Sequence, residues 1–259
     1  MIGIFDSGIG GLTVARAIEK LLPHHSLLYF GDTARTPYGT KSAQVIIDYS
    51  LRNAEFLLEK GAEIIVIGCN SASSVATESL RSEFNVPVFE VIGPAAKQAV
   101  NSSVSGRIGV IGTRATIRSG IYDTTIRDIN PACRVFSEPC PLLVQLVEEG
   151  WTNKQESKMI IRRYLHPLKD KQIDTLILGC THYPLLAELI QARIGKKVTL
   201  IDSSVEIAAT LERELPAALK KETKAVTSAQ SHFYFSDITV SAQNIASSIF
   251  GRTVELLTP

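Results

Sequence analysis

The sequence lacks both a strong net charge and a long apolar run. Its 27 Lys and Arg residues against 26 Asp and Glu residues give a formal charge of +1 at pH 7, so no overall field draws the chain to nucleic acid or to an anionic membrane. The longest apolar runs, such as residues 64–67, are far shorter than the roughly 18 residues that a membrane-spanning helix requires. We therefore expect neither a nucleic-acid partner nor a membrane partner.

The sequence also lacks a secretory signal and has few cysteines. Met1 leads directly into Ile2–Phe5, without the basic, apolar and small-residue segments of a signal peptide. Four cysteines are too few for a disulfide framework in a chain of this length; they are Cys69, Cys133, Cys140 and Cys180. We expect a cytoplasmic protein whose thiols are free, each being either a small buried apolar group or a reactive one.

Length and composition predict a folded chain of one large or two modest domains. The 259 residues compare with roughly 150 residues per domain. Hydrophobic residues make up 45% and charged residues 20%, which is typical of a globular protein and argues against disorder.

Short β-branched and aromatic runs alternate with segments of helical period. The runs cover residues 2–5, 27–30, 64–67, 87–91, 108–111, 134–136, 175–178 and 198–201. The longest helical patterns lie at residues 12–22, 42–60, 154–168 and 205–219. Because each parallel pair of strands needs a crossover connection, usually a helix, this alternation predicts parallel sheets covered on both faces.

The spacing of the runs indicates an internal repeat. Starts at residues 2, 27, 64 and 87 give steps of 25, 37 and 23, and starts at 108, 134, 175 and 198 give steps of 26, 41 and 23. Any doubly wound protein could show similar spacing, but residues 64–70 and 175–181 also share a Gly-Cys pair at the same place. We predict two similar doubly wound α/β domains related by a pseudo-two-fold axis, with the active site between them.

The predicted domains are residues 1–94 together with 207–259, and residues 95–206. The chain after residue 203 contains a helical pattern, a polar stretch at 220–231, a strand-like run at 233–235 and a helical pattern at 238–250 that stops at Gly251. Such a tail more simply completes the first unit than forms a third domain.

Ligands of open parallel sheets bind outside the carboxyl ends of the strands. The candidate residues at those ends are Asp6 and Ser7, then Gly31, Asp32 and Thr33, then Cys69, Asn70 and Ser71, and finally Cys180, Thr181 and His182.

Two of the cysteines stand at equivalent places in the repeat. Cys69 and Cys180 each follow a buried strand and a glycine, and each precedes a predicted helix start. The N–H groups and dipole of a helix N-terminus lower a thiol pKa, so we expect reactive thiols there. One such cysteine could be a buried filler, but two equivalent ones favour chemistry. Cys133 and Cys140 lack this context and are predicted to be fillers.

Several cysteine chemistries do not fit the sequence. A phosphatase loop needs an arginine six residues after the cysteine, where Val75 and Leu186 stand, and no Cys-x-x-Cys pair is present for dithiol exchange or zinc. A cysteine hydrolase remains an alternative, although it leaves one of the two thiols unused.

A nucleotide-dependent oxidoreductase is the main alternative. The first loop, Gly8–Gly11, is glycine-rich and Asp32 follows about 20 residues later, as in the dinucleotide-binding fingerprint. Thr13 replaces the third glycine, however, and Asp6 would repel a pyrophosphate. The glycines would more simply let backbone N–H groups approach a small anion such as a carboxylate.

Two thiols facing each other suit one reaction especially well. Removing a proton from one face of a carbon and returning one to the other face needs two bases, one acting as thiolate and the other as thiol. Asp6 and His182 would be the partners that tune the two cysteines, although either residue could instead be a helix cap.

Five blocks in the sequence resemble those of the glutamate racemases in the cofactor-independent aspartate/glutamate racemase superfamily. They are Phe5–Thr13 (FDSGIGGLT), Gly31–Gly39 (GDTARTPYG), Gly68–Ser73 (GCNSAS), the segment from Cys140 (CPLL) to Gly150 (EEG), and Gly179–Leu185 (GCTHYPL). They occur in family order over most of the chain. The Pro-Tyr-Gly and Cys-Thr-His-Tyr-Pro segments favour glutamate over aspartate.

The resemblance implies interconversion of L- and D-glutamate without a cofactor or a metal, supplying D-glutamate for peptidoglycan in a bacterial cytoplasm. It also implies a homodimer. By position, the acid/base residues would be Cys69 and Cys180, with Asp6 and His182 beside them. The substrate-binding positions would be Asp6, Ser7, Tyr38, Gly39, Asn70, Ser71, Thr181 and His182, with Glu148 behind the second cysteine. Ser71 replaces the family's usual threonine; it keeps the hydroxyl and loses a methyl contact.

Overall fold

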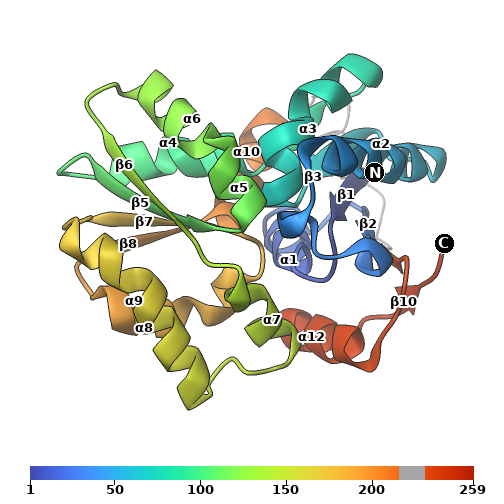
Figure 1. Ribbon diagram of the computed structural model, residues 1–259. Coiled ribbons are helices and arrows are strands. Elements are labelled where there is room, and N and C mark those ends of the chain that lie inside the picture. The colour runs from blue at the N-terminus through green and yellow to red at the C-terminus, as the bar shows by residue number, and fades with distance from the viewer. Residues whose placement is uncertain (216–230) are drawn as a thin grey trace.

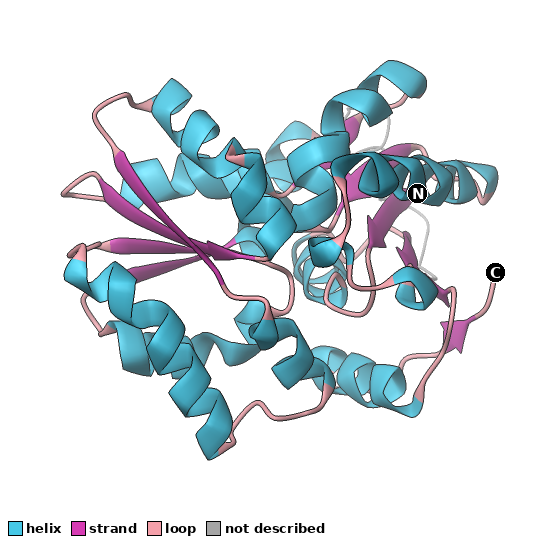
Figure 2. Cartoon of the chain, viewed as in Figure 1, coloured by secondary structure: helices cyan, strands magenta, loops and turns pink. Residues whose placement is uncertain are grey.

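The strands form two separate, entirely parallel sheets in the computed structural model, which describes residues 1–215 and 231–259 (Figures 1 and 2). The first sheet has the order β10-β9-β2-β1-β3-β4 and the second β6-β5-β7-β8. The first comprises β1 (Ile2–Asp6), β2 (Leu27–Gly31), β3 (Ile64–Ile67), β4 (Val88–Glu90), β9 (His232–Phe235) and β10 (Leu256–Leu257). The second comprises β5 (Arg107–Gly112), β6 (Arg134–Pro139), β7 (Thr175–Gly179) and β8 (Thr199–Asp202).

The strand order confirms the predicted α/β fold class and the repeat. Each of the eight predicted runs is a strand, and its bounds differ from the expected ones by one residue at most, except that β6 ends three residues later than predicted. The four strands of the first half are arranged β2-β1-β3-β4 and those of the second half β6-β5-β7-β8, which is the same order. The two halves therefore share one topology as well as one spacing.

Helices cover both sheets. They are α1 (Leu12–Leu21), α2 (Ala43–Glu59), α3 (Asn70–Glu83), α4 (Ile92–Ser102), α5 (Arg114–Ser119), α6 (Ile121–Ile129), α7 (Leu142–Glu148), α8 (Gln155–Asp170), α9 (Ala187–Ile194), α10 (Ser203–Glu214) and α12 (Val240–Phe250). Short 3-10 turns are η1 (Thr33–Arg35), η2 (Tyr38–Thr40) and η3 (Tyr183–Leu186). Within the described residues, no helix combines the length and the apolarity that crossing a bilayer needs.

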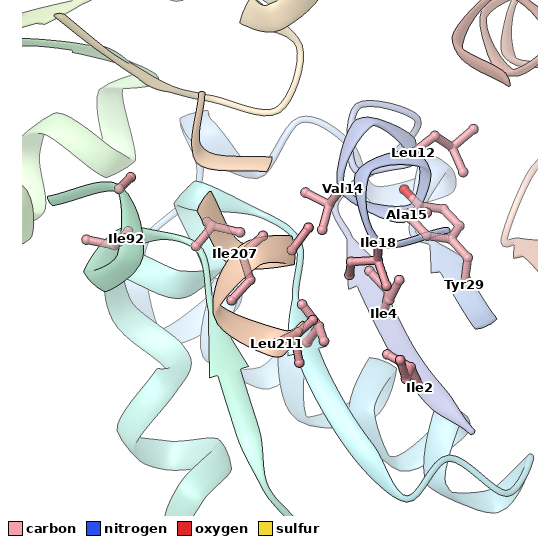
Figure 3. Close-up of a cluster of buried hydrophobic side chains, with 14 of the residues drawn as sticks. Ile2, Ile4, Leu12, Val14, Ala15, Ile18, Tyr29, Ile92, Ile207 and Leu211 are labelled. Carbon is pink, nitrogen blue, oxygen red and sulfur yellow. The ribbon is translucent and has the colours of Figure 1, made fainter. Parts of the chain in front are cut away.

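The period-two alternation of β1 divides the core of the first sheet between its two faces. Ile2 and Ile4 are buried with Ile18 of α1 and Leu211 of α10 on one face (Figure 3). Phe5 is buried in a second cluster with residues of α2 and α3 on the other face. A strand buried on both faces reads as a continuous apolar run, which is why these strands are visible in the sequence.

Helices α4 and α10 join the two halves into one continuous core. Their side chains share a cluster with Ile4 of the first sheet and with Ile108 and Ile177 of the second. Helix α10 begins immediately after β8 and packs along α1. Both predicted domain boundaries fall inside these two helices, and the division of the chain stays a prediction.

The tail adds two strands to the first sheet. Strand β9 pairs in parallel with β2, and β10 pairs with β9. Helix α12 begins after Thr239, whose hydroxyl accepts the Ala242 N–H, and ends at Gly251, whose φ of 65° is the left-handed cap that the sequence predicted. The polar stretch up to residue 230, and the predicted continuation of the preceding helix beyond residue 215, lie outside the described residues.

Replacing Phe235 by alanine tests whether the tail strand is part of this core. Phe235 is fully buried and lies 5.5 Å, centroid to centroid, from the ring of Tyr29. We expect the free energy of unfolding to fall by about 3–5 kcal/mol because a large cavity is left behind. Urea unfolding followed by circular dichroism measures the change, and Val104→Ala, at a side chain that is 98% exposed, is the control. Equal unfolding midpoints for Phe235→Ala and the wild type would contradict the prediction.

Candidate active site

Loops at the carboxyl ends of strands from both sheets enclose one small cavity. Its volume is about 20 Å³, which is room for little more than one water molecule. Its lining contains both cysteines of the repeat and all but two of the predicted site residues: Ser7, Thr36, Pro37, Tyr38, Gly39, Cys69, Asn70, Ser71, Thr113, Val144, Cys180, Thr181 and His182. Asp6 and Glu148 lie behind this lining.

Cys69 immediately precedes α3 and is buried. Its Sγ lies 3.6 Å from the Ser7 Oγ. Burial, together with the negative charge of Asp6, raises the pKa of the Cys69 thiol well above its usual range, although N–H groups of Ala72 and Ser7 act in the opposite direction. The predicted lowering of the Cys69 pKa is therefore wrong for this structure, because burial away from water raises the pKa more than the helix N-terminus lowers it. With this cavity closed to water, Cys69 is a neutral thiol.

The backbone of the glycine-rich first loop surrounds the carboxylate of Asp6. Its Oδ2 accepts the N–H groups of Gly8 and Gly11, both at 3.0 Å, so these donors bind the protein's own carboxylate. Burial raises the pKa of Asp6, while the charge of His182 and hydrogen bonds from the loop and from Cys69 lower it. Because the loop donates inward, the nucleotide alternative loses the anion site on which it depended.

The loop also needs its glycines for contact between the two halves. A Cβ on Gly10 would lie 2.4 Å from the His182 Nδ1 and 2.5 Å from the Thr181 Oγ1. The Thr13 hydroxyl donates to the Thr181 carbonyl at 3.1 Å. A side chain at Gly10 would therefore push the two halves apart at the site itself.

His182 connects Cys180 to Glu148. Its Nδ1 lies 3.9 Å from the Cys180 Sγ and its Nε2 lies 3.2 Å from the Glu148 Oε1. Burial lowers the pKa of His182, but hydrogen bonds and charge interactions with Cys180 and Glu148 outweigh it and raise the pKa to about 10. The imidazolium present at neutral pH can donate to both partners, so positive charge lies beside the second thiol.

The two cysteines differ in their local backbone. Cys69 occupies the N-cap position of α3. Cys180 is followed instead by the 3-10 turn η3, which contains Pro184, and the α-helix starts only at Ala187. The predicted helix start after Cys180 is therefore wrong by one turn.

The supporting side chains do not follow the repeat. Matching residues 64–70 with 175–181 pairs Cys69 with Cys180 and, two residues on, Ser71 with His182. Ser71 bonds Thr113 of the other half instead, with 2.8 Å between the hydroxyl oxygens. A symmetric scaffold thus carries an acid beside one thiol and an imidazolium beside the other.

Sequence reasoning missed Thr113. It follows β5 at the position that Ser7 occupies after β1, so strict use of the repeat could have found it. A Cβ on Gly39 would lie 2.6 Å from the Thr113 Cβ. Thr113 therefore closes the cavity against both Ser71 and the Gly39 segment. Thr36, Pro37 and Val144 were also missed as lining residues, although the first two lie in the Gly31–Gly39 block and Val144 lies in the segment from Cys140 to Gly150.

Comparisons with known proteins agree with this geometry. The family model described as Asp/Glu/Hydantoin racemase matches residues 12–211. A glutamate racemase of Geobacter metallireducens is 46% identical over 239 residues, which are 92% of this chain and 87% of that protein. One from Aquifex aeolicus is 44% identical over 254 residues, which are 98% and 95% of the two chains. The chain belongs to the Asp/Glu/Hydantoin racemase family.

Solved structures place it with the glutamate racemases of that family. Glutamate racemase isoform RacE1 of Bacillus anthracis has a TM-score of 0.92 and 34% identity, with 100% of this chain and 97% of that one covered. The Francisella tularensis glutamate racemase, solved in complex with D-glutamate, has a TM-score of 0.90 and 35% identity, with 100% and 95% covered. The resemblance seen in the five sequence blocks is confirmed.

The remaining polar residues of this racemase site already have protein partners. The Asn70 Oδ1 accepts the Tyr122 hydroxyl at 2.7 Å, and its Nδ2 donates to the Ser203 Oγ at 3.3 Å. Cys133 and Cys140 are buried and do not line the cavity. Among the described residues, no three His, Cys, Asp or Glu side chains are grouped to hold a metal ion.

Replacing Glu148 by glutamine tests the charge on His182. We expect the His182 pKa to fall from about 10 toward its ordinary value of 6.5 because the carboxylate no longer stabilises the imidazolium. A raised folded-state pKa stabilises the fold fully below about pH 6.5, and this stabilisation is lost as the pH rises to about 10. The stability difference between wild type and variant should therefore shrink over that interval.

Imidazole nitrogen shifts in NMR spectra measure the His182 pKa, and thermal unfolding at several pH values measures the stability difference. Glu149→Gln, at the exposed neighbouring residue, is the matched control. An unchanged His182 pKa in Glu148→Gln would show that Cys180, without Glu148, keeps the imidazole of His182 protonated.

Proposed function

We propose that this protein interconverts L-glutamate and D-glutamate by proton transfer at Cα between two cysteines, without a cofactor. The observation that carries the proposal is that Cys69 and Cys180, from two separate sheets, line one cavity. The names of its relatives, and the D-glutamate complex of the Francisella tularensis enzyme, support glutamate as the substrate.

In this mechanism one sulfur removes the Cα proton and the other thiol donates a proton to the opposite face. The substrate's ammonium group enters beside the Asp6 and Cys69 pair and favours the anionic sulfur, which offsets the effect of burial. Asp6 accepts and returns the Cys69 proton, and the His182 imidazolium stabilises negative charge on the Cys180 sulfur. The roles of the two sulfurs exchange when the direction of reaction is reversed.

The lining residues would bind the rest of the substrate. Ser7, Asn70, Ser71 and Thr181 offer hydroxyl and amide groups to the ammonium and the carboxylates, and the segment containing Tyr38 and Gly39 closes one side. The cavity is too small for glutamate, so the loops of the two halves must separate for entry and close again. Closure excludes water, which strengthens every charge interaction inside.

Three further predictions accompany this function. The D-glutamate would serve peptidoglycan synthesis, the protein would be cytoplasmic, and it would form a homodimer.

Incubating the protein with L-glutamate in deuterium oxide tests the reaction. We expect D-glutamate that carries deuterium at Cα from the first turnovers, while the remaining L-glutamate acquires deuterium later, because each face has its own base. Chiral chromatography with mass spectrometry measures both species. The absence of exchange with any small amino acid would falsify the proposal, and retention of the original proton in the product would show one shared base.

Replacing each cysteine separately tests the two-base mechanism. Cys69→Ser and Cys180→Ser should each lower kcat for racemisation by roughly 10²–10⁴-fold or more, because serine is a much weaker acid and a poor base in this role. Cys133→Ser, at a buried thiol away from the cavity, is the matched control. Near-normal activity in either catalytic variant means that one cysteine suffices.

A further inference from the structure

Asp32 is a buried carboxylate that the mechanism does not use. It follows β2, is fully buried and does not line the cavity. Its Oδ1 accepts the Arg35 Nε at 2.8 Å and the Ser236 Oγ at 3.2 Å, and its Oδ2 accepts the Tyr38 hydroxyl. Burying a carboxylate costs free energy unless hydrogen-bond donors surround it. Three side chains donate to Asp32, which indicates that its carboxylate holds the surrounding segments together.

The Tyr38 hydroxyl is turned toward this carboxylate. The residue lines the cavity, yet its hydroxyl donates to Asp32 and accepts the Asn53 Nδ2 at 3.0 Å. The Asn53 Oδ1 accepts the Arg35 Nη2 at 3.2 Å, which closes a ring of four side chains. Burial and the charge of Asp32 raise the pKa of Tyr38 above its usual range, so the hydroxyl keeps the proton that it donates.

This ring fixes the chain on both sides of Thr36 and Pro37. Residues 36–39 supply four members of the cavity lining, all from the first half. At the far end of the segment, Gly39 contacts Thr113 of the second half. The position of residues 36–39 therefore sets one wall of the site.

The tail segment after β9 holds the other side of Asp32. The Ala34 N–H donates to the Ser236 Oγ at 2.9 Å, and the Asp237 N–H donates to the Thr33 Oγ1 at 2.9 Å. The Ser236 N–H donates to the Gly31 carbonyl at 3.1 Å. Asp32 is thus the point at which β2, the tail and the cavity wall meet.

We propose that Asp32 is a positioning residue for substrate binding: it holds residues 36–39 in place through Tyr38 and Arg35, and the Tyr38 hydroxyl does not itself contact the substrate. The kinetic part of this proposal rests on the proposed racemase function. Arg35 and Tyr38 donate to different oxygens of Asp32, so Asp32→Asn places its amide NH2, itself a donor, against one of them and loses that hydrogen bond.

Kinetics of Asp32→Asn, Tyr38→Phe and the double variant test the proposal. We expect KM for glutamate to rise about tenfold in each single variant, which matches one lost hydrogen bond to a charged group, while kcat falls less than threefold. The KM of the double variant should exceed the higher of the two single-variant KM values by no more than about twofold, because both changes break the same hydrogen-bond network. Asp48→Asn, at an exposed carboxylate on α2, is the matched control.

Hydrogen–deuterium exchange provides a readout that does not depend on the reaction. In Asp32→Asn, amides of a peptide covering residues 36–41 should exchange at least about tenfold faster, while those of α3 stay unchanged. Unchanged exchange there overturns the proposal, whether or not the wild type racemises glutamate. The proposal is also overturned if KM rises in Tyr38→Phe but not in Asp32→Asn. It is overturned as well if the KM of the double variant rises by the product of the two single effects. A wild type that does not racemise glutamate refutes the proposed function instead.

Discussion

The close contact between the first glycine-rich loop and the Thr181–His182 turn is the constraint on which the site depends. Gly10 has no side chain to keep these segments apart, and a Cβ there would overlap the imidazole of His182. The contact brings strand ends from two sheets around one cavity and removes water from it. Burial then governs the chemistry, because it raises the pKa values of both Asp6 and Cys69.

The pseudo-symmetric scaffold carries an asymmetric charge distribution. The repeat places two sulfurs at equivalent strand ends, which suits proton transfer to either face of one carbon. Their supporting groups differ, since Asp6 lies beside Cys69 while His182 and Glu148 lie beside Cys180. A carboxyl group and an imidazolium give the two thiols different surroundings, so the two directions of the reaction need not pass through equivalent protonation states.

The tail contributes to the site although none of its described residues lines the cavity. Ser236 donates to Asp32 at the end of β2. In α12, which lies beside α7 (Figure 1), Ser241 donates to the Glu148 carbonyl at 2.6 Å. One contact supports the wall formed by residues 36–39 and the other supports the partner of His182. The last segment of the chain therefore stabilises both halves of the site at a distance.

The sequence by itself determined the eight strands of the repeat, their parallel topology and the equivalent positions of Cys69 and Cys180, because doubly buried strands appear as apolar runs and a repeat copies its spacing. It did not reveal Thr113 as part of the wall, the inward-facing donors of Gly8 and Gly11, or the direction of the Cys69 pKa. Only the tertiary structure decided these, because they depend on how closely segments distant in sequence approach and on how much water that approach removes.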